Sequence, residues 1–281
     1  MTRLDVRKTY KLYINGDFPR SESGRSYPAL DDRGEVVARV ALASRKDLRD
    51  AVRAARTALP KWAGKTGYNR GQVMYRIAEL VEDRREAFAE QLALGGLTLA
   101  RARSEVDRSI DRMVWYAGWC DKFAQIYGNL NPVAGPFFNI SAPEPTGVVG
   151  VIAPSEPALL GLVTRLAPAL AGGNALVVLA SEPQPLPSIT LAEVMEAADV
   201  PGGVINILTG SPTELVPWLA DHMDVNGIDA TGADDELRMR IDQGSVHNVK
   251  RVVAVEDAEA QSPYLIAAFT ELKTVWHPKG L

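Results

Sequence analysis

The side chains that could do chemistry in this sequence are few and widely spaced. Cys120 is the only cysteine among 281 residues, so the chain cannot form an internal disulfide. A thiolate could act as a nucleophile, but Cys120 falls on the apolar stripe of a helix predicted over residues 99–126. This position predicts a buried, unreactive thiol. His222, His247 and His277 have no ligand-like spacing, so we expect no metal site.

Composition and charge narrow the class of protein. Hydrophobic residues make up 46% and charged residues 23% of the chain, which is ordinary for a soluble globular protein. The net charge of −4 argues against a nucleic-acid-binding protein, which usually has a basic face. No apolar run approaches the roughly 18–20 residues that span a bilayer, and residues 1–8 lack the apolar core of a signal peptide. We therefore expect a cytoplasmic protein that contacts neither membrane nor nucleic acid.

The second half of the chain alternates apolar runs with helix-length segments. The runs lie at 148–153, 175–179, 204–208, 225–230 and 249–255, and the helical segments lie near 158–170, 188–198, 213–220 and 234–241. Near-continuous apolar runs suit strands that are covered on both faces. The alternation predicts an α/β fold with a doubly wound parallel sheet.

The first half reads as a small β region followed by helices. Asn15-Gly16 predicts a tight hairpin turn within residues 11–17, and residues 35–41 predict a further strand. Helices are predicted from Ser44, over 69–94 and over 99–126. The Pro-rich stretch 128–145 then breaks the helical pattern and contains a strand at 137–140 that we expect to leave the main body.

Several motifs run along nearly the whole chain in a fixed order. They include Leu-Tyr-Ile-Asn-Gly-Asp at 12–17, Ala-Gly-Trp at 117–119, Glu-Pro-Thr-Gly-Val-Val-Gly-Val-Ile-Ala-Pro at 144–154, Leu-Ala-Pro-Ala-Leu-Ala-Gly-Gly-Asn at 166–174, Val-Pro-Gly-Gly-Val-Ile-Asn-Ile-Leu-Thr-Gly at 200–210 and Asn-Val-Lys-Arg-Val at 248–252. Together these motifs resemble the first half of the NAD(P)-dependent aldehyde dehydrogenase superfamily. The resemblance implies a Rossmann-like NAD(P)-binding-like domain over 1–127 and 146–257, and an oligomerisation arm over 128–145 and 262–281. The family's cysteine-bearing catalytic domain has no counterpart, which implies a truncated, catalytically degenerate member.

The resemblance also implies that the family's catalytic groups are lost. Cys120 does not occupy the nucleophile position, and Glu156 stands where the family has an asparagine that stabilises an oxyanion. A carboxylate there would repel the oxyanion. Val255 occupies the position of the general base, and Glu256 lies one residue further on, where a strand turns its side chain to the other face. We expect no catalytic residue in this chain.

Cofactor contacts are expected to be vestigial for a similar reason. The residues that could still contact NAD(P) by resemblance are Glu182, Gly210, Thr231 and Gly232. Leu179 replaces a lysine, Pro212 replaces a glycine of the phosphate turn, and Ala233 replaces a serine. Gly210 and Gly232 could equally do no more than shape their turns. The prediction is that no cofactor binds, or that NAD(P) binds weakly.

The end of the chain predicts an interaction surface. The apolar residues of the arm that we expect at an interface are Phe137, Phe138, Ile140, Leu272, Val275 and Trp276. Soluble proteins avoid an exposed apolar edge strand. The arm is therefore expected to pair with a full-length aldehyde dehydrogenase subunit by strand addition, or with a second copy of this chain.

Three functional hypotheses follow. The first is a non-catalytic subunit that stabilises or positions an active aldehyde dehydrogenase. The alternative is a subunit that binds NAD(P) and contributes to aldehyde oxidation or senses the cofactor. The third is a truncated relic without a selected role, although a retained C-terminal strand argues against random truncation.

Overall fold

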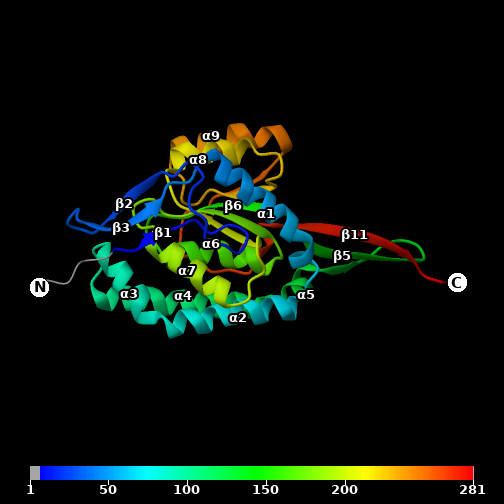
Figure 1. Ribbon diagram of the computed structural model, residues 1–281. Helices are drawn as coiled ribbons and strands as arrows, with labels where there is room; N and C mark the ends of the chain where they lie inside the picture. The colour runs from blue at the N-terminus through cyan, green and yellow to red at the C-terminus, as the bar shows by residue number, and fades with distance from the viewer. Residues whose placement is uncertain (1–6, 281) are drawn as a thin grey trace, which may run out of the picture.

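A five-stranded parallel sheet forms the centre of the molecule (Figure 1). The computed structural model describes residues 7–280. The strands are β6 (Val148–Ile152), β7 (Ala175–Leu179), β8 (Ile205–Leu208), β9 (Gly227–Asp229) and β10 (Arg251–Val253), in the spatial order β10-β9-β6-β7-β8. The reversal of strand order around β6 makes the sheet doubly wound, and the predicted α/β fold class is confirmed.

Alternate residues of the strands serve two separate cores. Val149 and Val151 of β6 pack into the core on one face of the sheet with Leu176. Val148 and Val177 pack into the core on the opposite face. Because successive side chains of a strand point to opposite faces, a run of apolar residues supplies both cores at once.

Helices cover both faces (Figure 1). On one face lie α1 (Arg45–Ala63), α8 (Pro212–Asp221) and α9 (Asp235–Ser245), followed by the short 3₁₀ helix η1 (Val246–Asn248). The other face is covered by α6 (Leu160–Ala171) and α7 (Leu186–Ala197). Beneath them lies a further layer formed by α2 (Gly67–Asp83), α3 (Arg85–Leu94) and α4 (Leu99–Trp119).

The helix starts follow the sequence closely, and two helix ends do not. Ser44 and Asp47 form the predicted capping box of α1: the N–H of Asp47 donates to Ser44 Oγ (3.3 Å), and the N–H of Ser44 donates to Asp47 Oδ2 (2.8 Å).

The single helix predicted over 69–94 is wrong, because the backbone breaks at Arg84. The break lets α3 pack on both α4 and α7. The helix predicted to residue 126 also ends early, at Trp119, and α5 (Phe123–Tyr127) follows after a turn.

A small N-terminal sheet attaches to the edge of the main sheet. It consists of β1 (Thr9–Tyr10), β2 (Ser26–Leu30) and β3 (Val36–Ala41) in the order β1-β3-β2. The predicted Asn15-Gly16 turn is confirmed, with φ angles of 58° and 86°. Tyr13 exchanges two backbone hydrogen bonds with Ile207 of β8 (2.9 and 2.8 Å), and these bonds join the hairpin to the sheet.

A long antiparallel arm projects from the body (Figure 1). Its strands are β4 (Asn129–Asn131), β5 (Phe137–Pro145) and β11 (Thr270–Pro278), in the order β11-β5-β4. The short helix α10 (Tyr264–Ala267) precedes β11, and Ile266 and Phe269 are buried in the core of the body. The C-terminal part of the arm thus begins at Thr270.

Side chains along one side of α4 hold residues 259–262, the segment that leads to the arm. Arg108 forms an ion pair with Glu259, and Arg112 Nε donates to Gln261 Oε1 (3.0 Å). The hydroxyl of Tyr116 donates to the carbonyl of Ser262 (3.2 Å). Residues at positions i, i+4 and i+8 lie along one side of a helix, so α4 fixes this segment at three successive points.

No helix within residues 7–280 is both long enough and apolar enough to span a membrane.

Candidate functional site

The carboxyl ends of the central strands carry the residues that the sequence singled out. Glu182 follows β7, Gly210 follows β8, and Thr231 and Gly232 follow β9. In open α/β sheets, ligands bind in the crevice outside the carboxyl ends of the strands. The four predicted cofactor residues therefore share one edge of the sheet.

Gly210 lies in a turn that packs against the end of β3. Its φ of +139° is a conformation that favours glycine, and a Cβ atom there would lie 3.2 Å from Ala43 N. The Thr209 hydroxyl donates to the carbonyl of Ala41 (2.6 Å), and the N–H of Ala43 donates to the carbonyl of Thr209 (2.8 Å). Glycine is thus required for a close approach within the protein. The amide N–H groups of Gly210 and Ser211 bond to no acceptor within residues 7–280.

The polar groups of Thr231 and Gly232 are used inside the protein. The hydroxyl of Thr231 accepts a hydrogen bond from the N–H of Val255 (3.2 Å). The N–H of Gly232 donates to the carbonyl of Ile152 (3.1 Å), and a Cβ on Gly232 would lie only 2.3 Å from the carbonyl oxygen of Ala153. This geometry favours turn-shaping roles for both residues, one of the two interpretations that the sequence left open for Gly232.

Among the four predicted cofactor residues, Glu182 has a carboxylate that is available to a ligand. It is exposed and makes no side-chain hydrogen bond to the described part of the chain. It lines a cavity of about 370 Å³ together with Tyr27 and Gln184. The carboxylate could accept hydrogen bonds from hydroxyl groups. Leu179, in contrast, is buried in the core beside α1 and offers nothing to a ligand.

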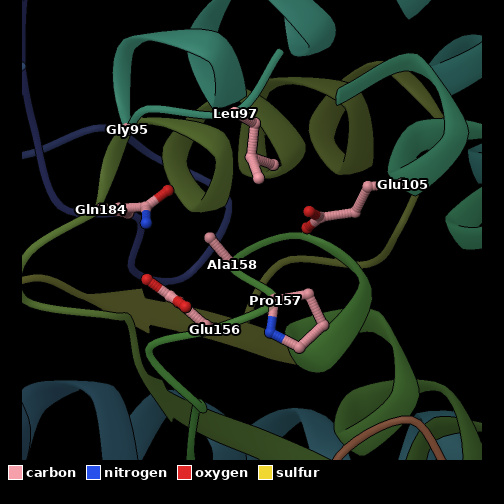
Figure 2. A pocket seen from close by; sticks show the side chains of 7 residues that line it. All are labelled: Gly95, Leu97, Glu105, Glu156, Pro157, Ala158 and Gln184. Atoms are coloured by element: carbon pink, nitrogen blue, oxygen red, sulfur yellow. The ribbon is translucent and has the colours of Figure 1, made fainter. Parts of the chain in front are cut away.

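A second cavity, which sequence reasoning missed, adjoins the first (Figure 2). It has a volume of about 320 Å³. Its lining residues are Gly95, Leu97, Glu105, Glu156, Pro157, Ala158 and Gln184. Figure 2 shows the side chains of Glu105, Glu156 and Gln184 around this space, each from a separate segment, with Glu105 on one side of Ala158 and Glu156 and Gln184 on the other. The sequence singled out Glu156 alone among them, as a residue unfavourable to an oxyanion.

Glu105 is the most deeply buried polar group of this cavity. It is 7% exposed, and its Oε1 accepts hydrogen bonds from the N–H groups of Leu159 (2.8 Å) and Leu160 (3.2 Å) at the start of α6. Burial raises the pKa of the Glu105 carboxyl, while these two hydrogen bonds oppose that rise. The available signal in the sequence was an acidic residue directly beside Val106 of the apolar stripe of this helix.

Cys120 lies away from both cavities and is buried as predicted. Its exposure is 6%, and its Sγ lies 3.5 Å from Met74 Sδ in the contact between α2 and α4. Burial raises the pKa of the Cys120 thiol to about 12. A thiol with this pKa is not a nucleophile near neutral pH.

The remaining candidates for chemistry do not come together. Glu256 lies exposed beyond the end of β10. Within residues 7–280, no group of three or more His, Cys, Asp or Glu side chains could hold a metal ion.

Comparison with known proteins identifies what this arrangement is similar to. Residues 20–276 match the family model described as the aldehyde dehydrogenase family. The chain is 33% identical to human cytosolic 10-formyltetrahydrofolate dehydrogenase over 281 residues, which cover 97% of this chain and 31% of that protein. It is 31% identical to cytosolic aldehyde dehydrogenase 1 of Elephantulus edwardii, covering 97% of this chain and 54% of that protein.

Solved structures give the same result. A point mutant of betaine aldehyde dehydrogenase from Staphylococcus aureus, in complex with NAD⁺, superimposes with a TM-score of 0.82 at 29% identity, covering 86% of this chain and 49% of that chain. An NAD⁺ complex of aldehyde dehydrogenase from Bacillus cereus matches with a TM-score of 0.82 at 28% identity, covering 87% and 50%. The chain thus spans between about a third and about half of the length of these relatives. Because both structures hold NAD⁺, the comparisons do not support the prediction that this chain binds no cofactor.

Proposed function

Because the chain belongs to the aldehyde dehydrogenase family, we propose that it is a non-catalytic subunit which assembles with an active aldehyde dehydrogenase through its arm. The observation that carries this proposal is the arm itself, which exposes apolar side chains on both faces and an unpaired edge strand. Stabilising or positioning the active subunit would then be the role of this chain.

The six predicted interface residues divide between the two faces of the arm. The strand register places Phe137, Leu272 and Trp276 on one face and Phe138, Ile140 and Val275 on the other. Trp276 and Leu272 are each 57% exposed, and Val275 is 50% exposed. Exposed apolar groups in this number are typical of a surface that another protein covers.

Polar side chains distinguish the first face from the second. Asn131 Nδ2 donates to Asn139 Oδ1 (2.7 Å) and to Ser141 Oγ (2.8 Å), and Ser141 Oγ lies 2.8 Å from Thr274 Oγ1. These residues share the face of Trp276. On the opposite face Leu130 lies beside Ile140 and Val275, and the polar contact there, the ion pair of Lys273 with Glu144, lies nearer the base of the arm. We infer that the face with Leu130, Ile140 and Val275 gains more from being covered.

The outer edge of the arm offers a second means of contact. β11 pairs with β5 along nine residues, and no strand of the described chain lies on its other side. A partner strand could add to this edge through backbone hydrogen bonds. A full-length aldehyde dehydrogenase subunit is the proposed partner, and a second copy of this chain is the alternative.

The chemistry of the described residues supports a role without catalysis. Cys120 is buried with a pKa raised to about 12. Glu156 presents a carboxylate where the resemblance predicts an oxyanion-stabilising amide, and a carboxylate accepts hydrogen bonds but cannot donate them.

Co-expression with a full-length aldehyde dehydrogenase from the same source tests the proposal, with native mass spectrometry as the readout. We expect a mixed oligomer that Val275→Asp disrupts. Val114→Asp is the matched control, because Val114 is also exposed but lies on α4, outside the arm. A chain that runs alone as a clean oligomer in the presence of the full-length enzyme would overturn the proposal.

Cofactor binding is a second candidate function, and the free groups at the sheet edge favour it. Glu182 offers a carboxylate, and the amides of Gly210 and Ser211 lie at the N-terminus of α8, where backbone N–H groups suit a phosphate. Leu179 and Pro212 oppose it. Isothermal titration with NAD⁺ and NADP⁺ should show affinity that Glu182→Ala lowers, and absence of heat in both titrations would exclude this function.

A further inference from the structure

The sequence contains two Asn-Gly pairs, at 15–16 and 226–227, and the fold places them in opposite surroundings. An asparagine followed by glycine can lose its side-chain amide, because glycine has no Cβ to hinder attack by its backbone nitrogen on the asparagine side chain. The reaction needs an asparagine side chain that can rotate and a glycine N–H that is not held in a hydrogen bond. The two pairs differ in both respects.

The reacting groups of the first pair are available at the surface. Asn15 is exposed, and its side chain makes no hydrogen bond within residues 7–280. The N–H of Gly16 likewise bonds to no acceptor in this range. The loop is closed on either side by two backbone hydrogen bonds between Ile14 and Asp17, both of 3.0 Å. The side-chain amide and the following N–H therefore lie together in a surface turn without partners of their own.

The second pair is held by the central sheet. Asn226 Oδ1 accepts hydrogen bonds from the N–H of Val148 (3.0 Å) and from Arg56 Nη2 (2.7 Å). Gly227 is buried at the start of β9, which pairs with β10 on one side and with β6 on the other. Attack on the Asn226 side chain would require the sheet to open here, so the fold protects this pair.

The surroundings of Asn15 also suit the product of the reaction. Asn15 lines an open cleft of about 460 Å³ together with Asp50 and Arg53 of α1. Asp50 forms an ion pair with Arg49, whereas Arg53 forms none with another described residue. Water has access to an open cleft, and the guanidinium of Arg53 would attract a carboxylate formed at position 15.

We propose that Asn15 is a site of spontaneous deamidation. The backbone nitrogen of Gly16 loses its proton and forms a bond to Asn15 Cγ, and the side-chain nitrogen of Asn15 leaves as ammonia. One water molecule then hydrolyses the cyclic imide at either of its carbonyl groups. The product is aspartate or isoaspartate at position 15, and the step consumes water and releases ammonia without oxidation or reduction.

The isoaspartate product loosens the hairpin. It places a methylene group in the main chain of a loop that is built for two residues. The carbonyl of Asn15 packs on Gly202, where a Cβ would lie 2.6 Å from its oxygen, and the N–H of Asn15 donates to Asn206 Oδ1 (2.9 Å). A lengthened turn cannot keep these contacts together with the hydrogen bonds between Tyr13 and Ile207, so the attachment of the hairpin to β8 weakens.

Incubation of the intact chain at mildly alkaline pH, with and without urea, tests the proposal. Peptide mapping by mass spectrometry measures the exchange of an amide for a carboxyl group at each pair. In urea we expect Asn15 and Asn226 to react at similar rates, because each follows a β-branched residue and precedes glycine. In the native chain Asn15 should react about tenfold faster than Asn226 or more, since strands of a core open far more rarely than surface turns.

Two results would overturn the proposal. One is a native Asn15 that stays unchanged over the period in which the urea-unfolded chain is converted. The other is a native Asn226 that reacts as fast as Asn15.

Asn15→Gly is the matched variant for the structural consequence. A Gly-Gly pair suits the same turn, so the hairpin is expected to form, and the reacting amide is gone. During ageing the wild type should lose thermal stability in step with the isoaspartate that it gains, while Asn15→Gly keeps its initial melting temperature. An equal loss in both proteins would overturn the conclusion that the modified turn weakens the hairpin.

Discussion

Arg165 on α6 and Asp229 at the end of β9 form an ion pair inside the protein, with Arg165 Nη1 3.8 Å from Asp229 Oδ2. Their side chains are 1% and 3% exposed. Asp229 Oδ1 also accepts the N–H of Thr231 (3.0 Å), and Arg165 Nη2 donates to the carbonyl of Ala260 (3.4 Å). The pair thus connects a helix, a strand end and the segment that leads to the arm.

Removing one member of this pair should strongly lower the free energy of unfolding, because the other member is left buried without its partner. Arg165→Met leaves an uncompensated buried carboxylate and should lower the free energy of unfolding by about 3–5 kcal/mol. Asp229→Asn keeps the acceptor for Thr231 but isolates the guanidinium, and should also be destabilising. The double variant should lose less than the sum of the two single losses. Urea unfolding of the four proteins measures the coupling, and strictly additive losses would show that the pair contributes nothing.

The contact between α2 and α4 depends on Gly67. A Cβ on Gly67 would lie 2.2 Å from the carbonyl oxygen of Cys120, whereas a Cβ on Gly118 of α4 would meet nothing within 4 Å. Gly67→Ala should therefore destabilise the protein by about 1–3 kcal/mol through overpacking. Gly118→Ala should be neutral or slightly stabilising, because alanine favours a helix more than glycine does, although Gly118 lies near the end of α4. Thermal unfolding of both variants checks this contrast, and equal shifts would contradict it.

The thiol of Cys120 should be inert in the native state. Because burial raises its pKa to about 12, almost none of it is thiolate at pH 7.5. We expect a chromogenic disulfide reagent to label the native chain only as fast as the protein opens, and to label the urea-unfolded chain at once. Labelling of the native chain at the rate of free cysteine would show that the side chain is accessible.

The central sheet could be predicted because one property of the sequence determines it. The strands β6 and β7 at its centre are unbroken apolar runs, and burial on both faces requires such a run regardless of neighbours far along the chain. The break at Arg84 has no comparable signal, since α2 and α3 have continuous helical patterning. It reflects packing of α3 on α4 and α7, which is a tertiary effect.

The candidate site was harder to predict because its residues meet only through the fold. Glu105 precedes Glu156 by about fifty positions, and the cavity between them depends on how α4 packs on α6. Resemblance pointed to Gly232 and Thr231 as cofactor contacts. Their hydrogen bonds to Ile152 and from Val255 exist only once β6, β9 and β10 lie side by side. Sequence patterns identify the edge of the sheet where a ligand could bind. The three-dimensional contacts decide which polar groups at that edge are not already hydrogen-bonded within the protein.

The raised pKa of Glu105 gives a pH dependence of stability with a definite sign. Burial raises the pKa of this carboxyl above its value in the unfolded chain, which is about 4.3. Below that pH both states are protonated, and the stabilising contribution of the neutral form is fully present. As the pH rises, the unfolded chain loses its proton first, so the free energy of unfolding falls until the folded carboxyl also ionises.

Glu105→Gln retains an acceptor for Leu159 and cannot titrate, so its stability should fall less over this interval. Urea unfolding of the wild type, Glu105→Gln and the exposed control Glu236→Gln at several pH values from 4 to 7 makes the comparison. The wild-type and Glu236→Gln curves should run parallel while Glu105→Gln diverges, and three parallel curves would mean that Glu105 titrates at its ordinary pKa.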